Sequence, residues 1–355
     1  MVLRSLVQPR STTARRLRGG LSALAICGAA TVLLAPSAAA APAYAFAVTA
    51  TVPVGNTPFF DAITTNGATT YVTNNDDDTV SAIDTATNTV TATIPVGDAP
   101  TGLAVTPDGS RVYVANREDD TLSIIDTATN TVAATVPGGT MPVNLAFTPN
   151  GARAYVTNND GSVSVIDTAT NTITANIPGV AGGPIGVAIT PDGAKAYVTG
   201  QDSSNLAVID AATNTVTATV PIAAPGMVAI SPDGARAYIP GQLANSVSVI
   251  DTATNTVTAT VPAGANPVGV AITADGNTVY VSNGGDGTVS TIDPDTNLVT
   301  DTVVVGAGPA GVDTTPDSTK AYVANSNDGT VSVITRTPEG QCTGSICFPS
   351  GSTGS

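Results

Sequence analysis

The sequence predicts an all-β protein, a seven-bladed β-propeller whose blades are four-stranded antiparallel sheets. Two landmarks recur in step along the chain, and no segment shows the 3.6-residue periodicity of an amphipathic helix. A proline recurs every 41 or 42 residues from Pro58 to Pro309. A tyrosine keeps the same spacing, at Tyr71, Tyr113, Tyr155, Tyr197, Tyr238, Tyr280 and Tyr322. A repeat of about 42 residues that holds four short strands is typical of one propeller blade.

The four strands can be followed through two neighbouring units. Residues 186–190 form an apolar first strand, and Pro191-Asp192-Gly193 turns the chain, because Pro presets φ and Gly accepts positive φ. Residues 194–199 form a second strand, which an Asn/Asp/Gly-rich loop follows. In the preceding unit, residues 163–166 alternate as a third strand, and residues 172–177 form a fourth after an Asp-Thr-Ala-Thr-Asn turn.

The ends of the repeat array predict how the ring closes. The fourth-strand pattern has a spare copy near Val48, before any other strand of its kind, whereas the last unit ends at Ile334 without one. We therefore expect the stretch from Phe46 to Val54 to complete the blade that starts at Pro309, which removes the free edge of an open array. An open solenoid is the alternative, and it predicts atypical capping units at both ends.

The N-terminal residues 1–45 are predicted to be a signal peptide that precedes a propeller at residues 46–335. Five arginines are followed by an apolar run at residues 21–34 and then by small residues that suit cleavage at about residue 41 or 45. A retained transmembrane anchor would need about 20 apolar residues, and this run is shorter. We therefore expect a secreted or cell-surface protein with no membrane attachment after cleavage.

The C-terminal residues 336–355 have the Gly/Ser/Thr/Pro-rich composition of a flexible tail. Cys342 and Cys347 lie in it, and Cys27 lies in the predicted leader. Outside the cytosol, the two cysteines of the tail are expected to form a small disulfide loop.

Composition excludes several classes of function. The chain has 27 acidic and 12 basic residues, a net charge of −15, and five of the basic residues lie in the predicted leader. Such an acidic mature chain is repelled by phosphate backbones and anionic membranes, so no nucleic-acid partner is expected. The absence of histidine excludes Ser-His-Asp and Cys-His catalysis and two-His zinc sites. We expect a monomer whose partner is a protein, a polymer or a cationic ligand at the cell surface.

A four-residue motif around the periodic tyrosine identifies a family resemblance. Residues 71–74 and 155–158 are Tyr-Val-Thr-Asn, with close variants at residues 113–116, 280–283 and 322–325. The chain resembles the YVTN-type seven-bladed β-propeller repeat proteins. The resemblance implies an exported, surface-layer-like protein and, more distantly, a relation to lactonases and antibiotic-opening lyases. The fourth and fifth units end the motif with Gly200 and with Pro240-Gly241, so a local irregularity is expected there.

Positions that obey the repeat are expected to be structural. The aspartate of each Ile-Asp pair, such as Asp84, precedes a Thr-x-Thr-Asn-type segment and is predicted to cap a turn. The tyrosines are predicted to pack in the core or between blades. Five cations stand two residues before a tyrosine and are interpreted as solvated partners of the turn aspartates; they are Arg111, Arg153, Lys195, Arg236 and Lys320.

The loops after the second strands carry most of the clustered acid. Ten acidic residues lie in these loops, so one face of the propeller is expected to be strongly negative. One interpretation is capture of Ca²⁺ or of a cationic partner, with the strongest candidates for a Ca²⁺ site at Asp76, Asp77, Asp78, Glu118, Asp119 and Asp120. The other interpretation is that Asp-Gly and Asn-Asp make good hairpin turns and that surplus acid keeps the protein soluble. Both stay open from the sequence.

Positions that break the repeat in the innermost strand are the candidates for a site at the channel mouth. Phe60, Asn144 and Met227 stand where four units have Gly, Asp61 where six have Leu or Val, and Asp313 where six have Ala. An acid beside an apolar core costs several kcal/mol unless it is partnered. Asp61 and Asp313 belong to the first and seventh units, which a closed ring makes neighbours, so they either face solvent in the channel or form a ligand or ion site.

Two classes of function follow from these residues. The first is an exported, non-catalytic propeller that acts as a binding or surface scaffold through its acidic loop face. The second is a metal-dependent lactonase- or lyase-like enzyme, with Asp61, Asn144 and Asp313 around one cation. No cofactor other than Ca²⁺ is expected, because the chain has no Cys-x-x-Cys-His motif for haem and no Trp to stack on a cofactor.

Overall fold

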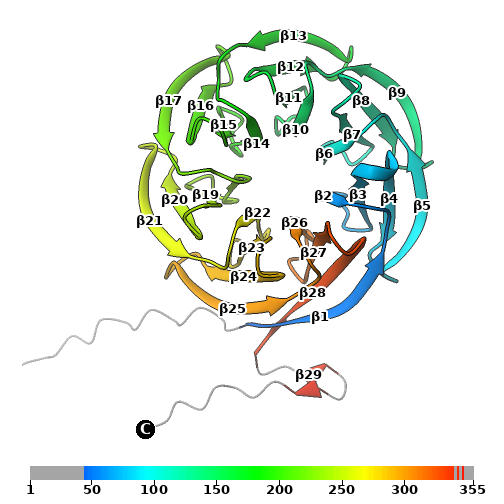
Figure 1. Ribbon diagram of the computed structural model, residues 1–355, viewed down its shortest axis with the longest axis vertical. Coiled ribbons are helices and arrows are strands. Elements are labelled where there is room, and N and C mark those ends of the chain that lie inside the picture. Colours follow the sequence, from blue (N-terminus) through cyan, green and yellow to red (C-terminus); the bar gives the residue numbers. More distant parts are fainter. Residues whose placement is uncertain (1–43, 340–341, 344–345, 348–355) are drawn as a thin grey trace, which may run out of the picture. The chain divides into compact units, whose positions relative to one another are not determined.

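The structure, a computed structural model, describes residues 44–339 together with 342–343 and 346–347. Seven four-stranded antiparallel sheets surround a central axis (Figure 1), so the predicted fold is confirmed. The predicted leader and most of the predicted tail lie outside the described residues. Within the described part of the chain the one helical element is the short 3₁₀ helix η1 (Asn75–Asp77), and no helix there is long and apolar enough to span a bilayer.

Each of the first four blades uses four consecutive strands. Blade 1 consists of β2 (Pro58–Ile63), β3 (Thr69–Asn74), β4 (Thr79–Asp84) and β5 (Thr89–Pro95). Blade 2 consists of β6 (Pro100–Val105), β7 (Arg111–Asn116), β8 (Thr121–Asp126) and β9 (Thr131–Pro137). Blade 3 consists of β10 (Pro142–Phe147), β11 (Arg153–Asn158), β12 (Val163–Asp167) and β13 (Thr172–Ile177). Blade 4 consists of β14 (Pro184–Ile189), β15 (Lys195–Gly200), β16 (Asn205–Asp210) and β17 (Thr215–Pro221).

The remaining strands complete the ring and add a short hairpin. Blade 5 consists of β18 (Ala229–Ile230), β19 (Arg236–Gly241), β20 (Ser246–Asp251) and β21 (Thr256–Pro262). Blade 6 consists of β22 (Pro267–Ile272), β23 (Val279–Asn283), β24 (Thr288–Asp293) and β25 (Leu298–Val304). Blade 7 consists of β26 (Pro309–Thr314), β27 (Lys320–Asn325), β28 (Thr330–Pro338) and, from the other end of the chain, β1 (Tyr44–Pro53). The hairpin pairs β29 (Cys342–Thr343) with β30 (Ile346–Cys347), but the cysteine side chains lie outside the described ones, so the disulfide stays a prediction.

The ring closes as the spare N-terminal strand predicts. Strand β1 pairs antiparallel with β28, from Tyr44 opposite Pro338 to Pro53 opposite Thr330. This pairing begins two residues before the predicted propeller boundary at residue 46 and continues three residues beyond the one at 335. Arg336 closes the outer end of the seam: its guanidinium lies 2.7 Å from the Asp275 carboxylate and stacks 3.5 Å from the centre of the Tyr44 ring.

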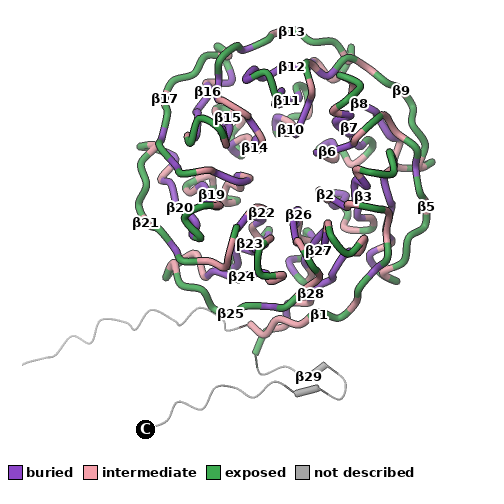
Figure 2. Tube along the Cα trace, viewed as in Figure 1, coloured by how far each residue is buried: buried purple, intermediate pink, exposed green. Residues whose placement is uncertain are grey.

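The periodic tyrosines join neighbouring blades. All seven are at most 1 % exposed, in the middle strands that Figure 2 shows as buried. Tyr155 of blade 3 donates to the Asn214 side chain in the last turn of blade 4, at 2.8 Å. Five tyrosines make this bond, to Asn130, Asn171, Asn214, Asn255 and Asn88. The predicted packing role is confirmed, with the hydroxyl as an inter-blade tie.

The other polar residues of the motif also have structural partners. Asn74 donates to the hydroxyls of Thr79 and Ser81, and its carbonyl oxygen accepts the N–H of Gly55 in the linker that enters the blade. The Thr73 hydroxyl accepts the N–H of Phe60 in the innermost strand. In blade 1 the motif therefore ties the second strand to the strand inside it and to the linker before it.

The structure corrects one interpretation and confirms another at the turns. The Asp84 carboxylate caps the turn to the fourth strand, as predicted, by accepting the N–H and hydroxyl of Thr87. The cations, in contrast, do not pair with turn aspartates. Lys195 and Lys320 donate instead to backbone carbonyls of the next blade, at 2.5 and 2.6 Å, and Arg336–Asp275 is the one ion pair among the described residues.

The predicted irregularity is found in the fifth blade, whereas β14 of the fourth blade keeps its full length. Strand β18 has only two residues. Pro240 replaces the Thr or Ser hydroxyl that holds the innermost strand in four of the other blades, and the Gly226 N–H bonds to the Pro240 carbonyl instead. The N–H of Met227 then bonds across to the Val268 carbonyl of blade 6, at 2.9 Å. The break in the repeat thus places Met227 at the axis.

Candidate functional site: a plugged central channel

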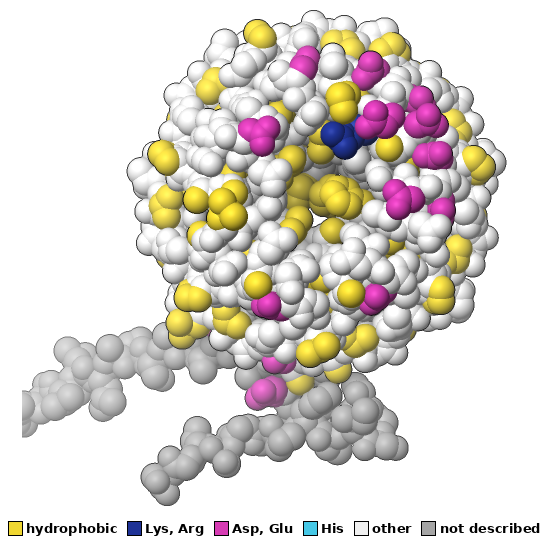
Figure 3. Space-filling model, in the orientation of Figure 1, with side chains coloured by type: hydrophobic (Ala, Val, Ile, Leu, Met, Phe, Trp, Pro, Cys, Tyr) yellow, Lys and Arg dark blue, Asp and Glu magenta, His cyan; other side chains and the backbone are white. Residues whose placement is uncertain are grey.

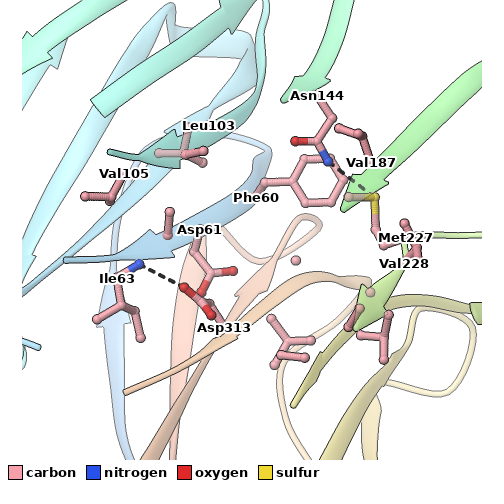
Figure 4. Close-up of a pocket in the computed structure, with 18 of the residues that line it drawn as sticks. Phe60, Asp61, Ile63, Leu103, Val105, Asn144, Val187, Met227, Val228 and Asp313 are labelled. Carbon is pink, nitrogen blue, oxygen red and sulfur yellow. Dashed lines mark hydrogen bonds between the residues drawn. The ribbon is translucent and has the colours of Figure 1, made fainter. Parts of the chain in front are cut away.

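The five residues that break the innermost-strand repeat all line the central channel. Figure 4 shows Phe60, Asn144 and Met227 facing one another, with Asp61 and Asp313 beside Phe60. The Asn144 amide nitrogen lies 3.7 Å from the Met227 sulfur. Phe60 and Met227 contribute to the walls of two separate cavities on either side of them. These two side chains therefore plug the channel.

The cavity on the side of the Pro-Asp-Gly turns, here called the turn-side cavity, has a volume of about 420 Å³. Most of the residues that line it have apolar side chains, with Leu103, Val187 and Ile272 among them. Asp61 of β2 and Asp313 of β26 line it from neighbouring blades, as ring closure predicts. Room for the Asp61 side chain exists because residue 311 is Gly: a Cβ there would approach the Asp61 carboxylate to 2.8 Å.

The two carboxyl groups differ in the hydrogen bonds that they accept. Asp313 accepts the N–H groups of Ile63 and Thr314, at 2.9 and 2.8 Å. Neither oxygen of Asp61 has a hydrogen-bond partner among the described residues, and both are buried. Burial, and then the nearby Asp313, hold the pKa of Asp61 well above its usual range. Burial raises the pKa of Asp313 to about 6, although the two backbone N–H groups act against it. The pair therefore favours retention of a proton.

Asn144 does not complete a cation site with these acids. Its carbonyl oxygen already accepts the N–H of Leu145, at 2.7 Å, and its amide nitrogen faces Met227. Among the described residues, no group of three or more His, Cys, Asp or Glu side chains is placed to hold a metal. The turn-side cavity thus offers two carboxyl groups in an apolar surrounding, an arrangement suited to proton transfer or to binding a hydrogen-bond donor.

The cavity on the opposite side of the plug, here called the loop-side cavity, was not predicted from the sequence. It has a volume of about 380 Å³ and an apolar lower wall. Its rim consists of the residues that directly follow the four-residue motif, namely Asn75, Arg117, Asn159, Gln201 and Gln242. The signal was present: this position does not keep one residue type through the repeat, and holds Asn, Gln or Arg in the first five units but Gly284 and Ser326 in the last two.

The rim side chains are partly held in place by hydrogen bonds. The Asn75 amide donates to the Pro100 carbonyl at 3.0 Å, and the Gln201 amide donates to the Gln242 amide oxygen at 2.9 Å. Arg117 is half-buried, and within the described residues its guanidinium has neither a hydrogen bond nor an ion pair. The rim therefore presents amide groups and one uncompensated positive charge.

The acidic loops beside this rim serve first as backbone ties. Asp77 accepts the N–H of Asn56 at 2.7 Å, Asp119 that of Asp98 at 2.8 Å, and Asp120 that of Met141 at 2.7 Å. Asp76 and Asp78 also have partners in the linkers, Thr57 and Ala99, whereas Glu118 is exposed. These carboxylates hold the linkers that enter the blades, and no group of three or more His, Cys, Asp or Glu side chains is placed to hold a metal in the part of the chain that the structure describes. Ca²⁺ at these loops stays a prediction.

The loop face remains strongly acidic despite these ties. Figure 3 shows acidic side chains gathered over one side of this face, a cationic side chain beside the central hollow, and apolar atoms within the hollow. The acids are exposed on a scaffold that fixes their positions, so the negative potential is a permanent property of this face.

Comparisons with known proteins support the propeller class. A model of YNCE-like β-propellers matches residues 23–161, and a model of seven-bladed β-propeller lactonases matches residues 189–346. No curated protein matches the sequence. The solved structure of hydrazine synthase from Kuenenia stuttgartiensis is similar, with a TM-score of 0.73 and 26% identity over 79% of this chain and 95% of that one. Because 1740 solved chains match, the likeness identifies a seven-bladed β-propeller and does not single out one activity.

Proposed function

We propose that this protein is an exported, non-catalytic binding scaffold that contacts its ligand or partner through the loop face. The observation that carries the proposal is the chemistry of the loop-side cavity. Arg117 is the only titratable side chain among the residues that line it, and a guanidinium does not exchange protons near neutral pH. Such a cavity is suited to binding and not to acid–base chemistry.

The acidic loops beside the rim define the charge of the partner. Fixed carboxylates on one face favour a cationic protein or polymer and increase its rate of association at low salt. Export follows from the predicted leader, and the surface-layer-like resemblance is consistent with a partner at the cell surface.

Titration with poly-lysine over a range of salt concentrations tests the charge of the partner. The variant Asp98→Asn/Glu118→Gln removes two exposed loop-face charges that accept no hydrogen bond among the described residues. It should weaken binding about two- to tenfold at low salt. The control Asp295→Asn/Asp301→Asn removes two exposed charges away from this face and should bind as the wild type does. Equal weakening by both variants would show that net charge, and not the loop face, governs binding.

The Asp61–Asp313 pair favours a second candidate, an enzyme of the lactonase or lyase type that uses the turn-side cavity. The lactonase-type model spans Asp313 but not Asp61. If this candidate is correct, the purified protein opens a lactone from a test panel and Asp313→Asn abolishes that activity. A metal-dependent version also requires bound metal and a melting temperature that falls on chelation. Absence of both removes the metal-dependent enzyme.

A further inference from the structure

We propose that the loop-side cavity binds a small organic monocarboxylate with an apolar body, whose carboxylate pairs with Arg117. This inference rests on the proposed function, in which the loop face binds ligands, and it specifies the chemistry of the ligand at the axis. Nothing in the sequence motif or the family likenesses assigns a ligand to this cavity.

The charge arrangement singles out Arg117. Arg111 begins β7 at the opposite end of the strand that Arg117 follows, and the cations at equivalent positions of other blades lie on that same turn side. Arg336 is paired with Asp275 in the seam. Arg117 is therefore the one described cation on the loop face. Its guanidinium forms no ion pair with the neighbouring acids among the described residues, and it contributes to the cavity wall. A guanidinium withdrawn from water gains most from a planar anion that accepts two parallel hydrogen bonds.

The rest of the cavity wall indicates the size and polarity of the part of the ligand that lies beyond its carboxylate. The floor consists of Phe60 and Met227, and Val143, Ile185 and Val268 form the lower wall. A volume of about 380 Å³ lies within the range of small-molecule sites, which are mostly apolar with a few oriented polar groups. Amide side chains on the rim supply donors and acceptors for a carboxylate or a neighbouring hydroxyl. One ring or a short alkyl chain fills such a space.

The acidic loops beside the rim limit which anions the cavity can bind. Carboxylates at residues 76–78 and 118–120 lie in the loops on one side of the mouth, so a dianion such as phosphate would meet repulsion that a single guanidinium cannot offset. A monocarboxylate carries half that charge and can keep its apolar part on the floor. The cavity chemistry therefore favours a monocarboxylate over a phosphate.

The test uses phenylacetate as the probe and phenylacetamide as its uncharged counterpart. The mature protein, labelled with ¹³C at the methionine methyl groups, carries one reporter on the cavity floor, Met227, and one in a linker, Met141. Phenylacetate should shift the Met227 signal in a saturable way, leave the Met141 signal unchanged, and bind at least tenfold more tightly than phenylacetamide.

Two variants decide whether the guanidinium is responsible. Arg117→Gln should weaken phenylacetate binding about ten- to hundredfold, because a hydrogen-bonded charge pair is lost, and should leave phenylacetamide binding unchanged. The matched control Arg111→Gln removes the same charge from the other end of the strand and should bind as the wild type does. Unchanged melting temperatures show that both variants fold.

Three results would overturn the inference. They are no saturable shift at millimolar phenylacetate, equal affinity for the acid and the amide, and undiminished binding by Arg117→Gln. If one of these occurs while poly-lysine binding still depends on Asp98 and Glu118, the cavity inference fails and the loop-face scaffold stands. If poly-lysine binding does not depend on those acids, the proposed function fails as well.

Discussion

The seven tyrosines allow one hydrogen bond to be measured against an internal control. The Tyr155 hydroxyl donates to the Asn214 side chain at 2.8 Å and lies 3.2 Å from the Ala211 carbonyl oxygen. The Tyr280 hydroxyl is equally buried but has no partner among the described residues. The reason is topological: the next blade is completed by β1 from the other chain end, so it has no Asp-Thr-Ala-Thr-Asn turn to supply the asparagine.

Removal of these two hydroxyl groups should have opposite consequences. Tyr155→Phe loses a net hydrogen bond and leaves the Asn214 oxygen without its donor, which together cost about 1.5 kcal/mol. Tyr280→Phe removes a buried hydroxyl that lacks a partner, which should stabilise the fold by about 1 kcal/mol. At about 2 °C per kcal/mol for a domain of this size, the melting temperature should fall by about 3 °C for the first variant and rise by about 2 °C for the second.

Differential scanning calorimetry of the mature protein and both variants, at one pH and one salt concentration, measures these shifts. Tyr113→Phe serves as a second paired example, since Tyr113 bonds to Asn171. A fall in melting temperature for Tyr280→Phe as large as that for Tyr155→Phe would refute the reasoning, because the hydroxyl would then contribute equally with and without an inter-blade partner.

Three further expectations concern the seam, the buried acids and the mature N-terminus. Arg336→Met should lower the free energy of unfolding by about 1 kcal/mol in urea titrations, because it removes the ion pair with Asp275, whose side chain is one-third exposed. Asp313 has a pKa of about 6 in the folded state, above the usual 3.8, so the folded protein holds a proton that the unfolded chain releases. The contribution of Asp313 to stability should therefore fall by about 3 kcal/mol as pH rises from about 4 to 6, and Asp313→Asn should remove this contribution; a variant with the pH dependence of the wild type contradicts the assignment. Intact-mass measurement of the exported protein should show cleavage before Tyr44, since its ring stacks on Arg336; a mature chain that starts at Phe46 would be the contrary result.

The fold could be predicted from the sequence because a repeat fixes both the unit and its phase. Tyrosine spacing gives the number of blades, and the spare fourth strand near Val48 gives the closure that β1 and β28 make. What could not be predicted was the use of the cations, since Lys195 and Lys320 bond to backbone carbonyls of the neighbouring blade. A carbonyl acceptor leaves no trace in the residue pattern, whereas an aspartate nearby suggests an ion pair.

The turn-side part of the candidate site could be predicted from the sequence for a related reason, whereas the loop-side part could not. Innermost strands converge on one axis, so any departure from their repeat must meet the others there, and Asp61 and Asp313 do so. The rim of the loop-side cavity was missed because Asn75, Arg117 and Gln201 follow the motif and were treated as part of the acidic loops. Their common position after each second strand places them around the axis, whereas acids that follow them, such as Asp77 and Asp119, hold the linkers.

The aspartates show why the candidate site had to be found from positions that break the repeat and not from residue type alone. Asp84 caps a turn in solvent, where donors from Thr87 lower its pKa. Asp119 ties a linker through the Asp98 N–H. Asp61 faces a second carboxyl group in an apolar cavity, and burial raises its pKa. The first two environments recur around the ring, so aspartates of these kinds contribute to the stability of the repeated fold. The third occurs where blades 1 and 7 meet and leaves two buried oxygens without donors. A destabilising feature confined to one place in a sevenfold structure is therefore the best candidate for a function that the repeat itself does not need.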